Sequence, residues 1–356
     1  MLAPHGDGSG PLTARRRSCI DASGPFQPAE IRMFRQSDVN RLVTVFGGSG
    51  FVGRHLIRAL CKRGYRIRVA VRRPDLAGHL QPLGRVGQIH AVQANLRHAG
   101  SIEAALRDAD AAVNLVGIMH ESGKQRFTEI QALGAERVAL AAANSGIRLV
   151  HMSALGADAQ SASRYAKSKA EGEQRVLAAK PDAVIMRPSI IFGPEDSFFN
   201  RFAAMARLSP ALPLIGGGLT RFQPVFAGDV ALAFADAVDG KARPGTIYEL
   251  GGPEVRSFKE LMQMMLALIG RKRLLVPIPF PIAKAMGAIA GILPSPPLTT
   301  DQVELLKRDT VVSEEALRDE RTLQGLGLKP TLMEAVLPSY LWRYRKAGQY
   351  SNGFAA

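Results

Sequence analysis

The stretch TVFGGSGFVGRHLIRAL, residues 44–60, places Gly47, Gly50 and Gly53 between an apolar run and an amphipathic one. A β-branched run that stops at glycine is typical of a buried parallel strand, and the residues after it have helical periodicity. In such a unit the first glycine permits a tight turn, and the second lets backbone N–H groups approach a pyrophosphate. The third lets the helix pack close to the sheet. The spacing therefore predicts phosphates held at a helix N-terminus, the alternative being a tight turn without a ligand.

The rest of the chain alternates strand and helix patterns, which favours the nucleotide interpretation. Strands are predicted over residues 42–46, 66–71, 89–95, 111–117, 147–154 and 183–193, and helices over 51–63, 101–109, 131–145 and 257–270. Serines are expected to cap the helices that start at Ser101 and Ser257. This rhythm predicts an α/β fold, a Rossmann-type doubly wound parallel sheet with a smaller C-terminal lobe.

Three regions follow from these patterns. Residues 41–193 are predicted to form the nucleotide-binding domain, with later strands returning to it, and residues 194–356 a smaller lobe that faces a substrate or a membrane. Residues 1–40 are rich in Gly, Pro, Ser and Ala and are expected to be a disordered extension. Three arginines, Arg15 to Arg17, permit a transit-peptide interpretation, but the acidic residues and Met33 favour a start extended upstream of the folded part.

The composition is that of an ordinary globular protein with a strong positive charge. The chain has 356 residues, a net charge of +15 and two cysteines, so neither a disulfide framework nor metal-ligand spacing is present. Positive charge favours an anionic neighbour, and the absence of nucleic-acid recognition motifs favours a phospholipid surface or an acidic protein over nucleic acid. The apolar stretch from Leu274 to Leu298 holds six prolines, so we expect a lobe surface or an interfacial dip, not a membrane span.

The end of the second predicted strand indicates which dinucleotide is bound. Arg72 and Arg73 stand where an acidic residue would bind the ribose 2′-hydroxyl of NAD, and a guanidinium instead matches a 2′-phosphate. We therefore expect NADP(H) over NAD(H), the alternative being a solvated turn. The full set of expected cofactor-binding residues is Gly47, Gly48, Ser49, Gly50, Phe51, Val52, Gly53, Arg72, Arg73, Asn95, Leu96, Val116, Gly117, Tyr165, Lys169 and Pro188.

The segment RYAKSK contains a candidate catalytic pair, Tyr165 and Lys169, at the i, i+4 spacing that shares one helix face. The lysine can lower the pKa of the tyrosine and bind the nicotinamide ribose, and the tyrosine can pass a proton while a hydride moves. Ser153, at the end of the fifth predicted strand, can hold the substrate oxygen. The alternative is that the three residues only anchor a tightly held cofactor. Glu195 and Asp196 are expected to cap a helix.

With these motifs the chain resembles the short-chain dehydrogenase/reductase superfamily in its extended or atypical branch. Within that branch it resembles the family of nucleotide-binding accessory subunits, number nine of the alpha subcomplex, of respiratory complex I and their bacterial relatives. The similarity covers residues 41–344. The stretches concerned are VTVFGGSGFVGRHL, VNLVG, SALGADAQSASRYAKSKAEGE, RPSIIFGPEDSFFNRFA, FQPVFAGDVA and PLTTDQVELLKRDTVV.

The resemblance implies a subunit on the peripheral arm that holds NADPH without established turnover, its C-terminal lobe near the quinone entry and lipid headgroups. Complex I subunits and an anionic membrane surface are the implied partners, on the cytoplasmic face of a bacterial inner membrane or the mitochondrial matrix side. The residues implied to hold the cofactor are Gly47, Gly50, Gly53, Arg72, Ser153, Tyr165 and Lys169.

Two other functions remain open at the level of the sequence. The first is an NADP-dependent reductase, dehydrogenase or epimerase acting on a sugar nucleotide, a steroid-like alcohol or a quinone-related molecule, with the second lobe as a lid. The second is a redox sensor that binds partners according to NADPH occupancy, which requires release of the nucleotide.

Overall fold

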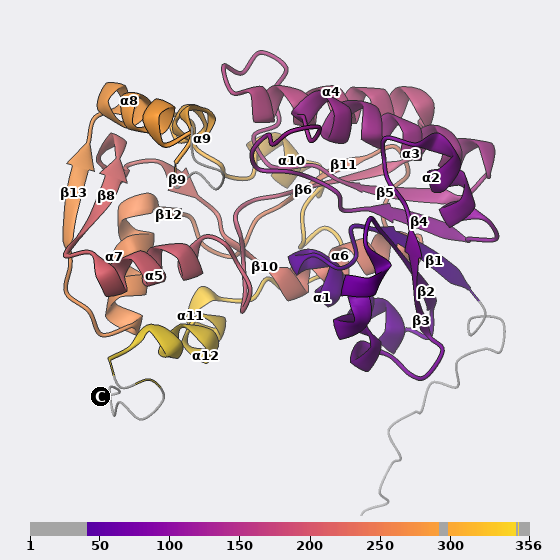
Figure 1. The fold of residues 1–356 in the computed structure, drawn as a ribbon, viewed down its shortest axis with the longest axis horizontal. Helices are drawn as coiled ribbons and strands as arrows, with labels where there is room; N and C mark the ends of the chain where they lie inside the picture. The colour runs from indigo at the N-terminus through magenta and orange to yellow at the C-terminus, as the bar shows by residue number, and fades with distance from the viewer. Residues whose placement is uncertain (1–40, 292–297, 347, 349–356) are drawn as a thin grey trace, which may run out of the picture.

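The computed structural model describes residues 41–291, 298–346 and 348. The extension predicted over residues 1–40 and part of the proline-rich stretch lie outside this range. Within it the chain forms a sheet domain and, beside it, a lobe built mainly from later residues (Figure 1).

Seven parallel strands form the central sheet, in the order β11-β6-β5-β4-β1-β2-β3. Their bounds are β1 Leu42–Phe46, β2 Arg66–Val71, β3 Ile89–Gln93, β4 Ala111–Asn114, β5 Arg148–Met152, β6 Val184–Pro188 and β11 Ile247–Leu250. All five residues of β1 are buried, because helices cover both faces of a parallel sheet. The predicted Rossmann-type fold is confirmed, and its strand order reverses between β1 and β4, where such sheets bind ligands.

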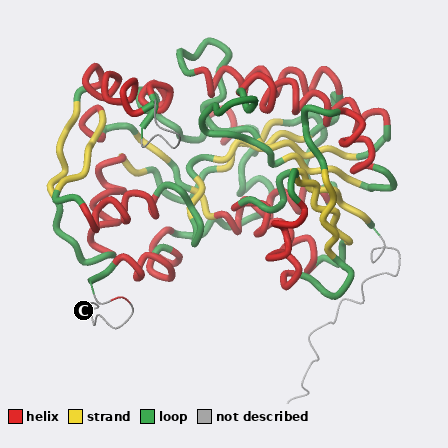
Figure 2. Tube along the Cα trace, viewed as in Figure 1, coloured by secondary structure: helices red, strands yellow, loops and turns green. Residues whose placement is uncertain are grey.

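Helices cover the sheet on both faces (Figures 1 and 2). On one face α1 (Phe51–Lys62) and α6 (Ala227–Val238) bury Leu56 and Phe234 against strand residues such as Val45. On the other, α2 (Ala99–Leu106), α3 (Leu133–Asn144) and α4 (Arg164–Ala179) share a second core with Leu149. The sheet is therefore held rigid between two apolar layers, and its carboxyl-end loops are left to form a site.

The C-terminal lobe has a separate core, formed largely by α5 (Phe199–Leu208), α7 (Phe258–Leu268), β8 (Ala211–Ile215), α11 (Met333–Val336) and α12 (Pro338–Leu341). The other elements are β7 Ile191–Phe192, β9 Arg221–Phe222, β10 Val225–Phe226, β12 Arg256–Ser257, β13 Leu274–Ile278, α8 Phe280–Ala290, α9 Thr300–Leu305 and α10 Glu314–Arg318. Short 3-10 or π segments lie at Pro74–Leu83, Thr128–Ala132, Gly216–Gly218 and Trp342–Tyr344. Strands β8 and β13 pair in parallel at the outer edge of the lobe.

Most predicted strands and helices are confirmed, and the predictions for Ser101 and for residues 183–193 are wrong for identifiable reasons. Ser257 caps α7 in a reciprocal capping box with Glu260, as expected. Ser101 does not cap α2, which begins at Ala99; its hydroxyl donates to the carbonyls of Asn95 and His98 instead. The single strand predicted over residues 183–193 is divided into β6 and β7, and β7 leaves the sheet to pair with β10.

The apolar stretch from Leu274 forms β13 and then the eleven-residue α8. In the described ranges no helix combines the length and apolar character that crossing a membrane requires.

Candidate functional site

The turn between β1 and α1 has the geometry that its glycines predict. Gly47 adopts φ +75°, a left-handed conformation that favours glycine, and the Gly50 N–H donates to its carbonyl at 3.1 Å. At Gly53 a Cβ atom would lie 2.4 Å from the Gly48 carbonyl oxygen, so any side chain would push α1 away from the turn. The N-terminus of α1 starts at this turn without a side-chain cap, which suits an anionic group.

Loops that follow neighbouring strands lie beside this turn. A Cβ on Gly47 would come within 3.1 Å of the Val116 side chain, and one on Gly117 would lie 3.4 Å from Lys169 Nζ. The structure therefore brings together the loops after β1 and β4 and the lysine of α4. The other predicted cofactor residues follow the carboxyl ends of their strands, with Arg72 and Arg73 after β2, Asn95 and Leu96 after β3, and Pro188 ending β6.

Arg72 and Arg73 have different surroundings. Arg73 forms an exposed ion pair with Asp75, Nη2 to Oδ2 at 2.8 Å, and the hydrogen bond from Arg73 lowers the pKa of that carboxyl. Arg72 is also exposed and forms no ion pair with the described part of the chain. Asp75, the first carboxylate after β2 in the sequence, is thus already engaged by Arg73, and Arg72 remains available to an anionic ligand.

Tyr165 and Lys169 lie in the first half of α4, as predicted. Lys169 is 4% exposed, and its Nζ donates to the Met152 carbonyl at 3.1 Å. Burial lowers the pKa of Lys169 to about 8, against the opposing effect of Glu173. The Tyr165 ring meets the Phe127 ring edge to face, with centroids 5.9 Å apart. Ser153 is 3% exposed, and its hydroxyl has no partner among the described residues.

One electrostatic expectation is wrong for this structure. Lys169 was predicted to lower the pKa of Tyr165, but burial, followed by the negative charge of Asp301, raises that pKa to about 12. Desolvation is the larger of the two effects on the tyrosine, and the lysine ammonium is bonded to the Met152 carbonyl. Tyr165 is therefore a protonated phenol at neutral pH.

The sequence did not single out His151 as a site residue, but the structure places it beside this group. It lies on β5 opposite Asn114 of β4 and is 2% exposed, with Nδ1 unpartnered among the described residues. Burial, and then the positive charge of Lys169, lower the pKa of His151 to about 3. The site therefore contains a neutral imidazole. From the sequence pattern of the strand alone, residue 151 would have been assigned only a core position.

Two carboxylates predicted to cap a helix have separate roles. Asp196 accepts from the backbone N–H of Asn200 in the first turn of α5, as a capping residue does, and from the Tyr340 hydroxyl. Glu195 instead forms an ion pair with Arg54 of α1 at 3.2 Å, and its other carboxylate oxygen lies 3.7 Å from Nε2 of His55, whose pKa is lowered by burial. Its role is to tie the loop after β7 to the nucleotide turn, so the capping prediction is wrong for Glu195.

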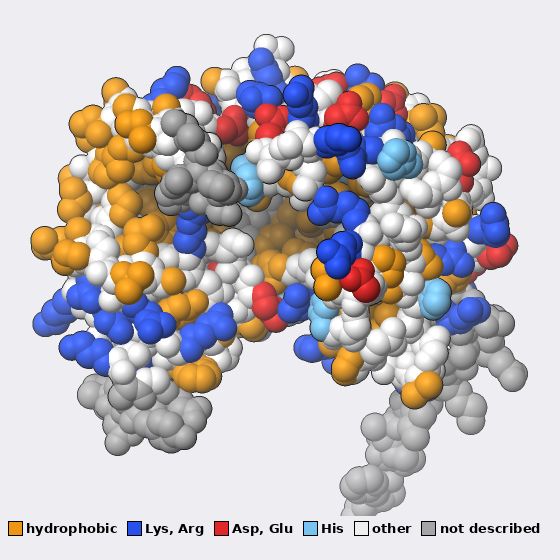
Figure 3. Space-filling model, viewed as in Figure 1, with side chains coloured by type: hydrophobic (Ala, Val, Ile, Leu, Met, Phe, Trp, Pro, Cys, Tyr) orange, Lys and Arg blue, Asp and Glu red, His pale blue; other side chains and the backbone are white. Residues whose placement is uncertain are grey.

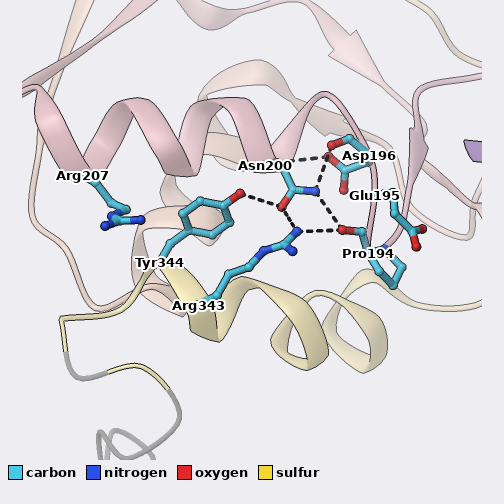
Figure 4. Close-up of a pocket in the computed structure, with 7 residues that line it drawn as sticks. All are labelled: Pro194, Glu195, Asp196, Asn200, Arg207, Arg343 and Tyr344. Atoms are coloured by element: carbon cyan, nitrogen blue, oxygen red, sulfur yellow. Dashed lines mark hydrogen bonds between the residues drawn. The ribbon is translucent and has the colours of Figure 1, made fainter.

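A surface pocket of about 490 Å³ lies next to these carboxylates, between α5 and the C-terminal turns (Figure 4). Its polar groups bind one another: Asn200 donates to the Pro194 carbonyl, and Arg343 and Tyr344 both donate to Asn200 Oδ1. This network fastens the C-terminal turns to α5, which is sufficient to explain the residues that line the pocket.

Comparison with known proteins identifies the class. The model of the NAD dependent epimerase/dehydratase family matches residues 43–251, so the chain belongs to this family. The fold agrees with that of dTDP-glucose 4,6-dehydratase from Streptomyces venezuelae, solved with NAD and TYD bound, at a TM-score of 0.66 and 22% identity over 85% of this chain and 96% of that one.

Two individual relatives are more similar in sequence than this solved structure is. NADH dehydrogenase (ubiquinone) 1 alpha subcomplex subunit 9, mitochondrial, of Arabidopsis thaliana is 38% identical over 327 residues, covering 88% of this chain and 80% of that protein. The Mus musculus protein of the same name is 31% identical over 316 residues, covering 87% and 82%. These matches confirm the resemblance to the complex I accessory subunits that the motifs predicted.

Because His151 is buried, the free energy of unfolding should depend on pH. An unfolded chain protonates His151 below about pH 6.5, whereas the folded chain does so only near pH 3. Wild type should therefore lose stability relative to His151→Leu as the pH falls from about 6.5 toward 3, by up to about 1.4 kcal/mol per pH unit. Urea unfolding at a series of pH values measures this, with exposed His90→Leu of β3 as the control. A pH-independent difference for His151→Leu would contradict a neutral buried imidazole.

Proposed function

We propose that this protein is an NADP(H)-binding accessory subunit of a membrane NADH:quinone oxidoreductase, complex I, in which the nucleotide is mainly a structural part. The observation that carries the proposal is the extent of the likeness to the alpha subcomplex subunits 9. It spans 327 residues and so continues past residue 251, where the general family match ends, into the C-terminal lobe.

The residues present fit a dinucleotide. The Gly47–Gly53 turn leaves space that a Cβ would fill, and it exposes the N-terminus of α1 to the phosphates. Arg72 is the residue proposed to bind a 2′-phosphate, and Ser153, Tyr165 and Lys169 are proposed to hold the nicotinamide end. When bound, such a nucleotide supplies or accepts a hydride at its nicotinamide ring.

The state of the triad favours holding the nucleotide over oxidising an alcohol. With its pKa raised to about 12, Tyr165 donates a proton at neutral pH but does not accept one. Lys169 donates one hydrogen bond to the Met152 carbonyl, which fixes the ammonium beside Gly117. Both side chains are thus placed as hydrogen-bond donors toward a bound ribose and amide.

The C-terminal lobe offers a surface for the membrane. Hydrophobic side chains gather over α8 and β13, and Lys and Arg side chains gather on the lower part of the same lobe (Figure 3). The exposed apolar side chains, 42–73% accessible, are Leu274, Val276, Ile282, Met286 and Ile289. An apolar patch beside positive charge fits anionic phospholipid, and the chain as a whole carries 46 basic and 31 acidic residues. We propose a peripheral position on the cytoplasmic face of a bacterial inner membrane, or on the matrix side in a mitochondrion.

Arg72 should set the preference for the phosphorylated nucleotide. Replacing it with Asp removes a charged partner of the 2′-phosphate and should weaken NADPH binding about 10- to 100-fold while leaving NADH binding unchanged or stronger. Isothermal titration calorimetry with both nucleotides measures the effect, and Arg85→Asp, an exposed arginine further along the same loop, is the control. Equal loss for both nucleotides would refute the assignment of Arg72.

Association with the complex tests the proposed function as a whole. We expect the tagged protein, purified from solubilised membranes, to bring down complex I subunits and to release NADP(H) on denaturation, as identified by mass spectrometry. The double variant Ile282→Asp and Ile289→Asp should reduce its recovery from membranes at least several-fold, because it places charge in the exposed apolar patch. Leu208→Asp, at a position 92% exposed on α5, is the matched control. Recovery without any complex I subunit would overturn the proposal.

A second candidate function is an NAD(P)-dependent reductase, dehydrogenase or epimerase, acting on a sugar nucleotide or a quinone-related or steroid-like alcohol. It is favoured by the buried Ser153 hydroxyl, which has no partner among the described residues and is free to bind a substrate oxygen.

Tyr165→Phe separates the two functions because it removes only the proton donor. Catalysis requires a loss of about 100-fold or more in turnover, seen as an altered metabolite profile of cells that carry the variant. The accessory role predicts unchanged growth and metabolites with the nucleotide still bound. Ser168→Ala, which removes a hydroxyl bonded within α4, is the control.

A further inference from the structure

The first turn of α4 is held from the other lobe by one carboxylate. Asp301 Oδ1 accepts from the backbone N–H of Arg164 at 2.6 Å, and Oδ2 accepts from that of Tyr165 at 3.2 Å. The Ser163 hydroxyl donates to Oδ2 at 2.8 Å and accepts from the Ala166 N–H. The backbone donors that a helix leaves unpaired in its first turn are therefore satisfied by Ser163 and Asp301 together.

Asp301 is itself firmly positioned, because α9 is anchored on several sides. Thr299 and Gln302 form a reciprocal capping box around its first turn. Glu304 pairs with Lys284 of α8 at 3.1 Å and with Lys307 at 2.8 Å. Val303 is fully buried in a cluster that includes Ala283 of α8. The carboxylate thus belongs to a packed unit of α8 and α9.

Close packing leaves this unit little freedom to slide. A Cβ on Gly287 of α8 would lie 2.9 Å from the backbone of Thr299 and Thr300, where α9 begins. A second tie runs from Arg308, just after α9, to Asp158 in the loop that precedes α4. The turn that carries Tyr165 is therefore positioned by the C-terminal lobe at two places.

We propose that Asp301 is a positioning residue for the nicotinamide half of the nucleotide site, supplied by the C-terminal lobe. The inference rests on the proposed binding of NADP(H). Lys169 follows Tyr165 by one helical turn on the same face of α4, so a shift of the capped end displaces both groups. In the described part of the chain, the hydrogen bonds of the Asp301 carboxylate go to Ser163, Arg164 and Tyr165 and not to the glycine turn after β1 or to Arg72, so we expect the adenosine half of the site to be independent of it.

The surroundings of Asp301 set it apart from an ordinary surface ion pair. It is half-buried and its partners are two backbone N–H groups and a hydroxyl, not a flexible cation. A carboxylate at a helix N-terminus also interacts favourably with the helix dipole. Its negative charge helps to keep Tyr165 protonated, since it contributes to the raised pKa of that phenol.

The experiment compares NADPH with adenosine 2′,5′-diphosphate (2′,5′-ADP), which contains the 2′-phosphate but lacks the nicotinamide ribose. Asp301→Ala should weaken NADPH binding about tenfold, in line with the loss of a helix cap, and leave binding of 2′,5′-ADP unchanged. Asp301→Asn should recover most of the affinity, because asparagine also caps helices well. Calorimetric titration of the full chain measures both ligands.

Asp309→Ala is the matched control. Asp309 is a carboxylate of the same lobe that accepts from the Arg221 backbone N–H and side chain and does not contact α4. It should leave the binding of both ligands unchanged. Unaltered binding of 2′,5′-ADP to Asp301→Ala also shows that the variant is folded.

The remaining outcomes are distinct. Equal weakening of both ligands, or of neither, by Asp301→Ala would overturn the positioning role while leaving NADP(H) binding intact. A wild-type protein that binds neither ligand would refute the proposed function, and with it this inference.

Discussion

The close approach of α1 to the turn after β1 is the constraint on which the site depends. At Gly53 there is no room for a Cβ against the Gly48 carbonyl, so a glycine is required for the start of α1 to lie this close to the turn after β1. The helix N–H groups then face the region where the strand order of the sheet reverses. A larger residue would move the helix and remove the one part of the site that is built from backbone donors alone.

The rest of the site is assembled from two cores that meet at its edge. Leu56 and Phe234 belong to the core under the nucleotide turn, whereas α9 packs with α8 in the C-terminal lobe. Two carboxylates connect the later residues to the sheet domain: Glu195, after β7, pairs with α1 in the core under the nucleotide turn, and Asp301 of α9 binds α4, which packs in the core on the other face of the sheet. The geometry around Tyr165 and Lys169 is consequently a property of both lobes together.

Electrostatics inside the site favour fixed donors over a proton acceptor. Burial raises the pKa of Tyr165 and lowers the pKa values of Lys169 and His151, so each group is biased toward its uncharged form. At neutral pH Tyr165 is still a phenol, His151 is a neutral imidazole and Lys169 is largely an ammonium, so tyrosine and lysine both act as hydrogen-bond donors. The same triad can still donate a proton, which is the direction that reduction of a carbonyl requires.

The sequence by itself determined the elements whose signals are local. The strand, glycine turn and helix over residues 42–62, the capped helix after Ser257, and the pairing of Tyr165 with Lys169 on one face all depend on residues a few positions apart. Such patterns reflect hydrophobic periodicity, capping and allowed φ values, which act within a few turns of chain.

Only the tertiary structure decided the contacts that set the chemistry. Asp301 reaches the backbone of Arg164 across 137 residues of sequence, and Glu195 reaches Arg54 across 141. The departure of β7 from the sheet and the burial of His151 likewise depend on neighbours supplied by distant segments. A helix cap supplied by another lobe and a pKa set by burial both arise from the packing of complete elements. Neither can therefore be predicted from the periodicity of the sequence.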